Sequence, residues 1–308
     1  MAEMNYQKLG KSDLEVSNWA LGCMRMADKS VDEAAAVIET ALELGVNFFD
    51  HADIYGGGES EKRFKAALDQ LGVDREKLIL QSKCGIREGY FDFSKEHILE
   101  AVDGSLERLG TDYLDVLLLH RPDALVEPEE VAEAFDELEQ AGKVRYFGVS
   151  NQNPGQMALL QQTVEQPFVC NQLEFGPAHT LLVDHGLHVN MAGREGAFHD
   201  AGILEYCRLH DVTIQSWSPF QVDLEQGLIF NHPDYEALTQ KLIDLGEKYG
   251  VSKEAMTIAF ILRHPAKMQP IIGSMNPDRL RLIAEANAVD LTREEWYEIY
   301  RASGHTVP

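Results

Sequence analysis

Short apolar runs alternate with longer amphipathic segments along most of this chain, and this pattern constrains its fold more than any other feature. The short runs are rich in branched and aromatic residues and cover residues 45–50, 77–83, 113–120, 144–150, 168–172, 212–218 and 268–273. The longer segments, in which apolar residues recur at intervals of three and four, include residues 31–44, 95–109, 128–141, 153–163 and 235–249. The pattern predicts strands that alternate with helices.

Such alternation implies parallel pairing, and continuously apolar strands imply burial on both faces of the sheet. A further run that ends at Leu21 brings the number of predicted strands to 8. Eight βα units in a chain of 308 residues predict an α/β fold, a closed (β/α)₈ TIM barrel forming a single domain over residues 1–308. Residues 176–202 lack a clear period and are predicted to form a long loop after the sixth strand.

A doubly wound open sheet is the structural alternative. No GxGxxG follows the first strand, so the usual sequence support for a dinucleotide-binding open sheet is missing. No stretch rich in Pro, Gly and Ser marks a linker to a second domain. The closed barrel is therefore the favoured interpretation.

The charge balance limits the classes of partner. With 51 acidic and 27 basic residues, the net charge of -24 repels nucleic acid and anionic membranes. No apolar run reaches transmembrane length, and the N-terminus lacks the layout of a signal peptide. The scattered cysteines, which form no CxxC pair, indicate reduced thiols: Cys23, Cys84, Cys170 and Cys207. We expect a soluble, cytoplasmic protein without a nucleic-acid or membrane partner.

Ionisable side chains stand at the ends of three successive predicted strands. The second strand ends at Asp50, the third at Lys83 and the fourth at His120, and Tyr55 lies on the loop after Asp50. In such a barrel these strand ends meet at one rim, where the active site forms. Taken singly, Asp50 could be a cap or turn residue, and Lys83 and His120 could be structural. Four compatible groups at one rim favour a catalytic function.

The four residue types suit proton donation to a carbonyl oxygen. A tyrosine hydroxyl has a pKa near ~10, and an ammonium such as that of Lys83 is expected to lower the pKa of Tyr55. Asp50 can pair with Lys83, and His120 can orient a carbonyl oxygen. A metal site at His51, Asp53 and His120 is the weaker alternative because no HxH or HExxH spacing supports it. We therefore predict no metal.

Several motifs, in this order, resemble those of the aldo-keto reductase family: FDHADIYGGGESE, LQSKCG, LDVLLLHRPD, GKVRYFGVSNQNP, CNQLEF, QSWSPF and PIIGSMNPDRL. They extend from Gly22 to about Asn287, and HADIYGG, SKCGI and residues 296–308 resemble the bacterial YdhF-like oxidoreductase branch in particular. The resemblance implies a (β/α)₈ barrel, a catalytic tetrad that matches Asp50, Tyr55, Lys83 and His120, and NADPH bound without a Rossmann fold.

The same resemblance implies which residues bind the cofactor. Ser150, Asn151 and Gln172 match the residues that hold the nicotinamide carboxamide, and Trp217 matches the aromatic that stacks on the ring. Trp217 alone would be a core aromatic. Ser218 and Phe220 match positions along the pyrophosphate, and Gly273, Ser274 and Arg279 match the segment at the adenosine phosphate. Gly22, Met24 and Asp50 are also predicted to contact the cofactor.

The chain departs from the family pattern at the phosphate end. Gly273 and Met275 are uncharged where relatives often carry Lys or Arg, and Leu282 and Ile283 replace a usual Glu-Asn pair. Arg281 lies two positions after Arg279 and so on a different helix face. We therefore predict NADPH as cofactor, with NADH possible and only a modest preference. His51 replaces a frequent Thr, without an evident consequence.

Four aromatic residues predict an apolar pocket mouth. Tyr90, Phe91 and Phe93 lie on the loop after the third predicted strand, and Phe220 lies on the loop after the seventh. The predicted function is NAD(P)H-dependent reduction of a small-molecule aldehyde or ketone by a monomer or weak homo-oligomer. Two other classes stay open. One is a cofactor-binding regulatory or interaction protein on the same barrel, as in potassium-channel β subunits. The other is a metal-dependent lyase or isomerase on an unrelated barrel.

Overall fold

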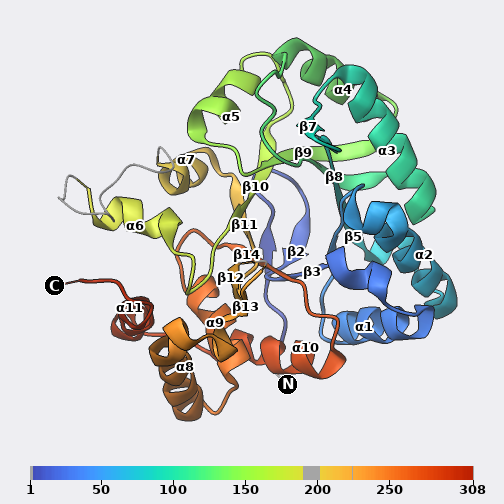
Figure 1. Cartoon of the computed structure of the whole chain (residues 1–308). Helices are drawn as coiled ribbons and strands as arrows, with labels where there is room; N and C mark the ends of the chain where they lie inside the picture. The colour runs from blue at the N-terminus through green and yellow to red at the C-terminus, as the bar shows by residue number, and fades with distance from the viewer. Residues whose placement is uncertain (1–2, 190–201, 224, 308) are drawn as a thin grey trace.

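Eight parallel strands close into a barrel in the computed structural model, which describes residues 3–189, 202–223 and 225–307 (Figure 1). The strands are β3 (Ala20–Gly22), β4 (Phe48–Asp50), β5 (Ile79–Cys84), β8 (Leu114–Leu119), β9 (Val144–Ser150), β10 (Phe168–Glu174), β11 (Thr213–Trp217) and β14 (Gln269–Ile272). Each pairs in parallel with the next, and β14 pairs with β3. The predicted barrel is confirmed, and the open-sheet alternative is wrong.

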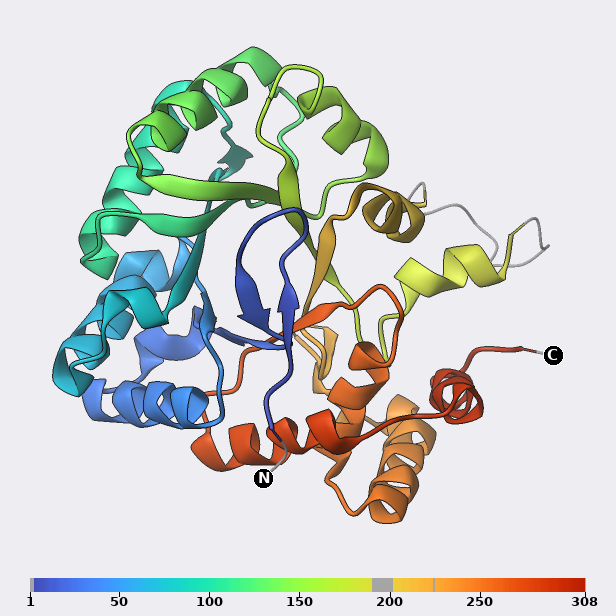
Figure 2. The ribbon, with the colours of Figure 1, turned by 180° about the vertical axis from the view of Figure 1, so that it is seen from behind.

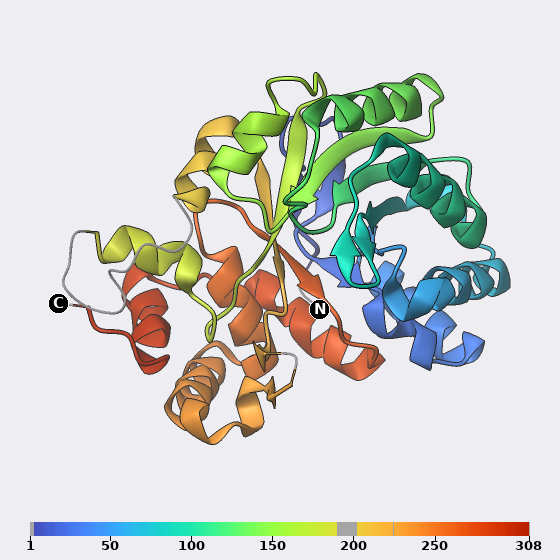
Figure 3. The same cartoon turned by 45° about the horizontal axis from the view of Figure 1, so that its top comes forward.

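Helices cover the outside of the barrel (Figures 1 and 3). They are α1 (Val31–Glu43), α2 (Glu59–Leu71), α3 (Lys95–Leu109), α4 (Pro128–Gln140), α5 (Pro154–Leu160), α6 (Leu181–Leu187), α7 (Ile203–His210), α8 (Glu236–Tyr249), α9 (Lys253–Leu262), α10 (Pro277–Ala284) and α11 (Arg293–Ala302). Their apolar faces and the outer faces of the strands form the larger hydrophobic core.

Capping side chains fix where several helices begin. Ser30 and Glu33 form a capping box at α1, in which each side chain accepts a hydrogen bond from the other residue's backbone N–H. Ser94 caps α3, and Gly110 ends it in the left-handed conformation at φ 63. Because these signals are local, the range predicted for this helix matches α3.

An antiparallel hairpin of β1 (Tyr6–Lys8) and β2 (Glu15–Ser17) lies across one end of the barrel (Figure 2). Leu9, Leu14 and Val16 of this hairpin region pack against lumen side chains such as Phe48 and Leu118 in a second core. This packing closes the end of the barrel where the strands begin, so the site must form at their C-terminal ends.

The long segment predicted after β10 is present, but it is not loop throughout. It contains α6, which packs beside α7 and α11, and residues 190–201 of it lie outside the described residues. Tyr300 on α11 donates a hydrogen bond to Asp184 on α6 at 2.7 Å. The helical period was missed because the helix is only 7 residues long.

Two further observations concern helices and thiols. Within the described ranges, every helix is too short or too polar to cross a membrane. The cysteines at 23, 84, 170 and 207 are buried and in the thiol form.

Candidate active site

Lys83 lies at the centre of the charged group at the rim. Its Nζ donates hydrogen bonds to Asp50 Oδ2 at 2.8 Å, to the backbone oxygen of His51 at 2.8 Å and to Tyr55 OH at 3.0 Å. An ammonium has three N–H donors, so all of them are committed. Because Lys83 is 1% exposed, only these partners compensate its loss of hydration.

Tyr55 reaches Lys83 because of a tight turn. Tyr55 is the first residue of η2 (Tyr55–Gly58), in which residues 56–58 are glycines at φ 59, 64 and 90. Side chains rarely adopt this left-handed conformation three times in succession. At Gly58 a Cβ would also lie 2.8 Å from Cδ of Arg108, whose Nε donates a hydrogen bond to the buried Glu61 carboxylate at 2.7 Å. The glycines therefore allow this turn to pack closely onto α3.

The Tyr55 hydroxyl accepts its hydrogen bond from Lys83, so its own proton remains available to a group in the cavity. Burial raises the pKa of Tyr55 above its ordinary value, and the Lys83 charge opposes that rise without cancelling it. The ammonium thus acts on this pKa in the predicted direction, but burial, which the sequence does not show, outweighs it. Burial also lowers the pKa of Lys83, but Asp50 and Tyr55 outweigh it and the net pKa is raised.

His120 follows β8 directly and stands beside the tyrosine. Its ring centroid lies 5.9 Å from that of Tyr55, with the two rings nearly perpendicular at 83°. Burial, followed by the charges of Lys83 and Arg121, lowers the pKa of His120 to about 2. The imidazole is therefore neutral near pH 7 and can donate one N–H without carrying charge.

His51 contributes its backbone, while its side chain belongs to the core. The ring packs on Phe64 at a centroid distance of 4.5 Å, and burial followed by the Lys83 charge lowers its pKa to about 3. The carboxyl of nearby Asp53 has a pKa raised to about 7 by burial and by Glu61. Within the described part of the chain, no three His, Cys, Asp or Glu side chains are grouped as a metal would need.

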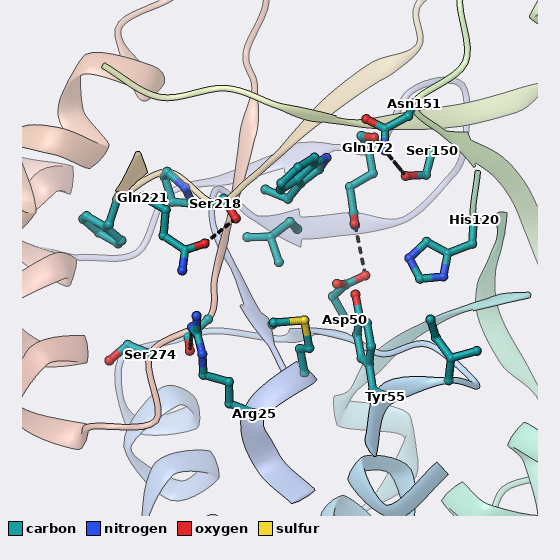
Figure 4. A pocket seen from close by; sticks show the side chains of 18 of the residues that line it. Arg25, Asp50, Tyr55, His120, Ser150, Asn151, Gln172, Ser218, Gln221 and Ser274 are labelled. Atoms are coloured by element: carbon teal, nitrogen blue, oxygen red, sulfur yellow. Dashed lines mark hydrogen bonds between the residues drawn. The ribbon is translucent and has the colours of Figure 1, made fainter. Parts of the chain in front are cut away.

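A cavity of about 480 Å³ opens above these residues (Figure 4). It brings together three of the predicted tetrad residues and every predicted cofactor-binding residue, while Lys83 lies buried beneath it. Its lining includes Gly22, Met24, Asp50, Tyr55, His120, Ser150, Asn151, Gln172, Trp217, Ser218, Phe220, Gly273, Ser274 and Arg279.

The side chains near Tyr55 fit a nicotinamide. Ser150 Oγ donates to the backbone oxygen of Gln172 at 3.1 Å and accepts from Asn151 Nδ2 at 3.2 Å. Asn151 and Ser218 hold left-handed backbone at φ 53 and 52, and such strain is frequent at ligand-binding positions. Trp217 offers an aromatic face for a flat ring. Hydroxyl, amide and aromatic groups are the donor set that a carboxamide-bearing ring requires.

The far end of the cavity fits an anionic group. Figure 4 shows Arg25 and Ser274 at this end, well apart from Tyr55 and His120, and Arg279, five positions after Ser274 in the chain, also lines the cavity. Arg25 Nη1 donates to the backbone oxygen of Gly273 at 3.3 Å. Arg25 was not predicted from the sequence, although its place just after the first strand of the barrel could have indicated this rim.

Arg281 faces away from this end of the cavity. Its guanidinium donates to Asp278 at 3.1 Å and to Thr40 at 3.3 Å, and it is absent from the lining. Arg279 is thus the nearer cation on α10, as the spacing of the two arginines predicts.

Three of the residues predicted for the pocket mouth lie elsewhere. Tyr90 and Phe91 are 54% and 44% exposed on β7 (Tyr90–Phe91), which pairs with β6 (Ile86–Arg87). Phe93 is 1% exposed and packs against Gly85. Only Phe220 lines the cavity, together with residues that the sequence analysis did not single out: Ile54, Ile86, Arg121, Gln221, Leu228 and Phe230.

Comparisons with known proteins identify relatives of this chain. A sequence model of the aldo/keto reductase family matches residues 19–303. Oxidoreductase YdhF of Escherichia coli (strain K12) is 38% identical over 307 residues, which cover 96% of each chain. The 6-dehydroglucose reductase of Agrobacterium fabrum is 34% identical over 308 residues, which cover 96% of this chain and 97% of its own. The resemblance drawn from the motifs is confirmed.

A solved structure is similar in fold. The crystal structure of the thermostable aldo-keto reductase Tm1743, in complex with the inhibitor epalrestat, has a TM-score of 0.78 to this chain at 24% identity. The match covers 97% of this chain and 100% of that one. At this identity the likeness supports the barrel itself and no residue-level role.

Proposed function

Since this chain belongs to the aldo/keto reductase family, we propose that it is a reductase that uses NADPH to convert aldehydes or ketones to alcohols, with Tyr55 as the proton donor. The observation that carries the proposal is the hydrogen bond of 3.0 Å from Lys83 Nζ to Tyr55 OH. Because Lys83 donates in this contact, the tyrosine proton is left for a carbonyl oxygen in the cavity.

The bound cofactor would supply the hydride that adds to the carbonyl carbon. Tyr55 donates its proton to the carbonyl oxygen as negative charge develops there, and the neutral His120 imidazole orients that oxygen by a hydrogen bond. Lys83 stabilises the phenolate that is left, and Asp50 holds Lys83 in place. The complete tetrad argues against a purely regulatory role without turnover.

The preference for NADPH over NADH would rest on local positive charge. Arg25 and Arg279 lie at the end of the cavity with Ser274, where a 2′-phosphate could pair with either guanidinium. Because Gly273 carries no charge, we propose a modest preference.

The substrate would be a small carbonyl compound. Two relatives, from Agrobacterium fabrum and Novosphingobium aromaticivorans, are named 6-dehydroglucose reductase. The catalytic end of this cavity combines apolar side chains such as Ile54 and Ile86 with the cation Arg121. We further propose that the protein acts in the cytoplasm as a monomer or weak homo-oligomer.

A direct assay tests the proposal. The purified protein is mixed with NADPH and 4-nitrobenzaldehyde, and absorbance at the nicotinamide band is followed. We expect a steady fall that requires both compounds and that a Tyr55→Phe variant nearly abolishes. If a panel of aldehydes and ketones gives no oxidation of either NADPH or NADH, the reductase proposal fails.

A further inference from the structure

Four glutamine side chains meet in the barrel lumen beneath the cavity, one each from β5, β10, β11 and β14. They are Gln81, Gln172, Gln215 and Gln269, and each is at most 3% exposed. The strand register aligns Gln172 with Gln215 and Gln215 with Gln269. Register partners on neighbouring parallel strands point to the same face of the sheet, so the barrel holds these amides side by side in its lumen.

The amides form a chain of hydrogen bonds that begins at the Asp50 carboxylate. Gln81 Nε2 and Gln172 Nε2 donate to Asp50 Oδ1 at 2.6 and 3.0 Å. The same two nitrogens donate to Gln215 Oε1 at 2.9 and 3.2 Å. Gln215 Nε2 in turn donates to Gln269 Oε1 at 2.9 Å. Each amide thus has one orientation relative to its neighbours.

The groups at the two ends of this series of hydrogen bonds can only accept hydrogen bonds. At the hairpin end, Gln269 Nε2 donates to the backbone oxygen of Ser17 at 2.8 Å. At the cavity end stands the Asp50 carboxylate, which is paired with Lys83. If any of these amides were flipped, two acceptor oxygens would face each other in the buried lumen, where the loss of a hydrogen bond is costly. The two ends therefore fix the orientation of every amide between them.

This arrangement decides what Gln172 presents to the cavity. Both N–H groups of its Nε2 are used by Asp50 and Gln215, whereas its Oε1 accepts no hydrogen bond from any residue that the structure describes. Gln172 also lines the cavity. An oxygen can accept only from the N–H₂ of a carboxamide and not from its C=O.

We propose that Gln215, supported by Gln81 and Gln269, is a positioning residue that acts together with Asp50 to make Gln172 an acceptor for the nicotinamide carboxamide. The proposal rests on the proposed function, because it concerns the cofactor of that reaction. A merely structural role of the same amides would affect stability and leave recognition of the carboxamide unchanged.

The test compares ligands that differ at one group. NADP⁺ carries a carboxamide, while its 3-acetylpyridine analogue carries a methyl ketone without N–H. We expect the wild type to bind NADP⁺ about three- to tenfold more tightly than the analogue, the difference that one hydrogen bond supplies. In Gln215→Met, where Asp50 alone still accepts from Gln172 Nε2, the difference between the two affinities should shrink. Affinity for 2′,5′-ADP, which lacks the nicotinamide, should not change. Isothermal titration calorimetry measures all three.

Two further variants complete the design. Gln166→Met is the matched control, since Gln166 is another buried glutamine that donates to carboxylates, at Asp136 and Glu139, but outside the lumen. It should keep the discrimination. Gln215→Glu should regain discrimination as the pH falls, because a protonated carboxyl has both an acceptor and a donor. If Gln215→Met does not fold, the pH dependence of Gln215→Glu tests the inference instead.

The outcomes separate the two proposals. Full discrimination in Gln215→Met, or no discrimination in the wild type, would overturn the inference about Gln215 and leave the reductase proposal standing. A Gln215→Glu variant whose discrimination is independent of pH would also overturn the inference. Failure of the wild type to bind NADP⁺ at all would instead overturn the proposed function.

Discussion

Tyr55 is the residue whose chemistry can be removed with least disturbance, because Tyr55→Phe keeps the ring against His120 and deletes only the hydroxyl. Loss of a positioned general acid typically costs ~10²–10⁴-fold in rate. We expect carbonyl reduction to fall by that order while NADPH affinity stays near that of the wild type. Steady-state kinetics and quenching of protein fluorescence measure the two quantities. A fully active variant would rule out Tyr55 as the proton donor.

Lys83→Met should affect both rate and stability. Turnover should collapse because the charge that stabilises the phenolate is lost. The variant also leaves the Asp50 carboxylate, 2% exposed, without its ion-pair partner, and breaking a buried pair costs about 3–5 kcal/mol. Denaturant unfolding measures this loss, and adding Asp50→Asn should restore stability without restoring activity. If Lys83→Met keeps most of its activity, Lys83 has only a structural role.

Arg279 should decide the choice of cofactor. A charge-assisted hydrogen bond to a 2′-phosphate contributes about 1.5–3 kcal/mol, or roughly 10–100-fold in affinity. Arg279→Ala should therefore remove most of the preference for NADPH over NADH, and Arg25→Ala a smaller part. Arg281→Ala is the control, because Asp278 and Thr40 hold that side chain away from the cavity. Fluorescence titrations with both cofactors would contradict this assignment if Arg279→Ala keeps the preference or if the wild type prefers NADH.

At the scale of an element, one buried carboxylate, that of Glu295, joins α11 to the end of α8. Burial alone would raise the pKa of Glu295, but hydrogen bonds from Lys248, Tyr249 and Thr292 lower it to about 2. A carboxyl with a lowered folded-state pKa contributes stability above its unfolded pKa of about 4.3, and this contribution is lost as the pH falls through the folded pKa.

Glu295→Gln should therefore lower Tm by a few degrees at pH 7, since about 1 kcal/mol corresponds to about 2–4 °C in a chain of roughly this size. The difference from the wild type should shrink as the pH is lowered from about 4.3 towards 2. Thermal melts followed by circular dichroism across this range measure it. A difference that is constant with pH would show that the Glu295 charge does not stabilise α11.

At the scale of the whole molecule, long-range and local charges oppose each other. The chain has a net charge of -24, yet the residues that line the cavity include Arg25, Arg121 and Arg279. The Debye length falls from about 30 Å at 0.01 M salt to about 8 Å at 0.15 M. Added salt therefore screens the repulsion of anionic NADPH by the whole chain more than its contacts with the arginines.

We expect the association rate constant of NADPH to rise at least about twofold between 10 and 150 mM salt. Stopped-flow fluorescence measures this rate. A fall in the rate over the same range would mean that the arginines, and not the net charge, dominate the approach of the cofactor.

Local patterns in the sequence were enough for the architecture and for much of the site. Apolar periodicity and the caps of the helices depend on neighbours in the chain, so helices such as α3 and strands such as β9 were predicted with their observed bounds. Parallel strands in a closed barrel end at one rim. Asp50, Lys83 and His120 could therefore be grouped without knowledge of their contacts, and family motifs indicated the residues that line the cavity.

Only the tertiary structure decided which side chains meet and how strongly burial acts on them. A loop sequence does not show which way its side chains face, so Phe93 was assigned to the pocket although it packs in the core. The net direction of the Tyr55 pKa depends on desolvation, which arises from the whole surrounding fold. Gln81 and Gln215 are 134 positions apart in the chain. Their contact exists only because the barrel closes, and no local pattern encodes such a neighbour.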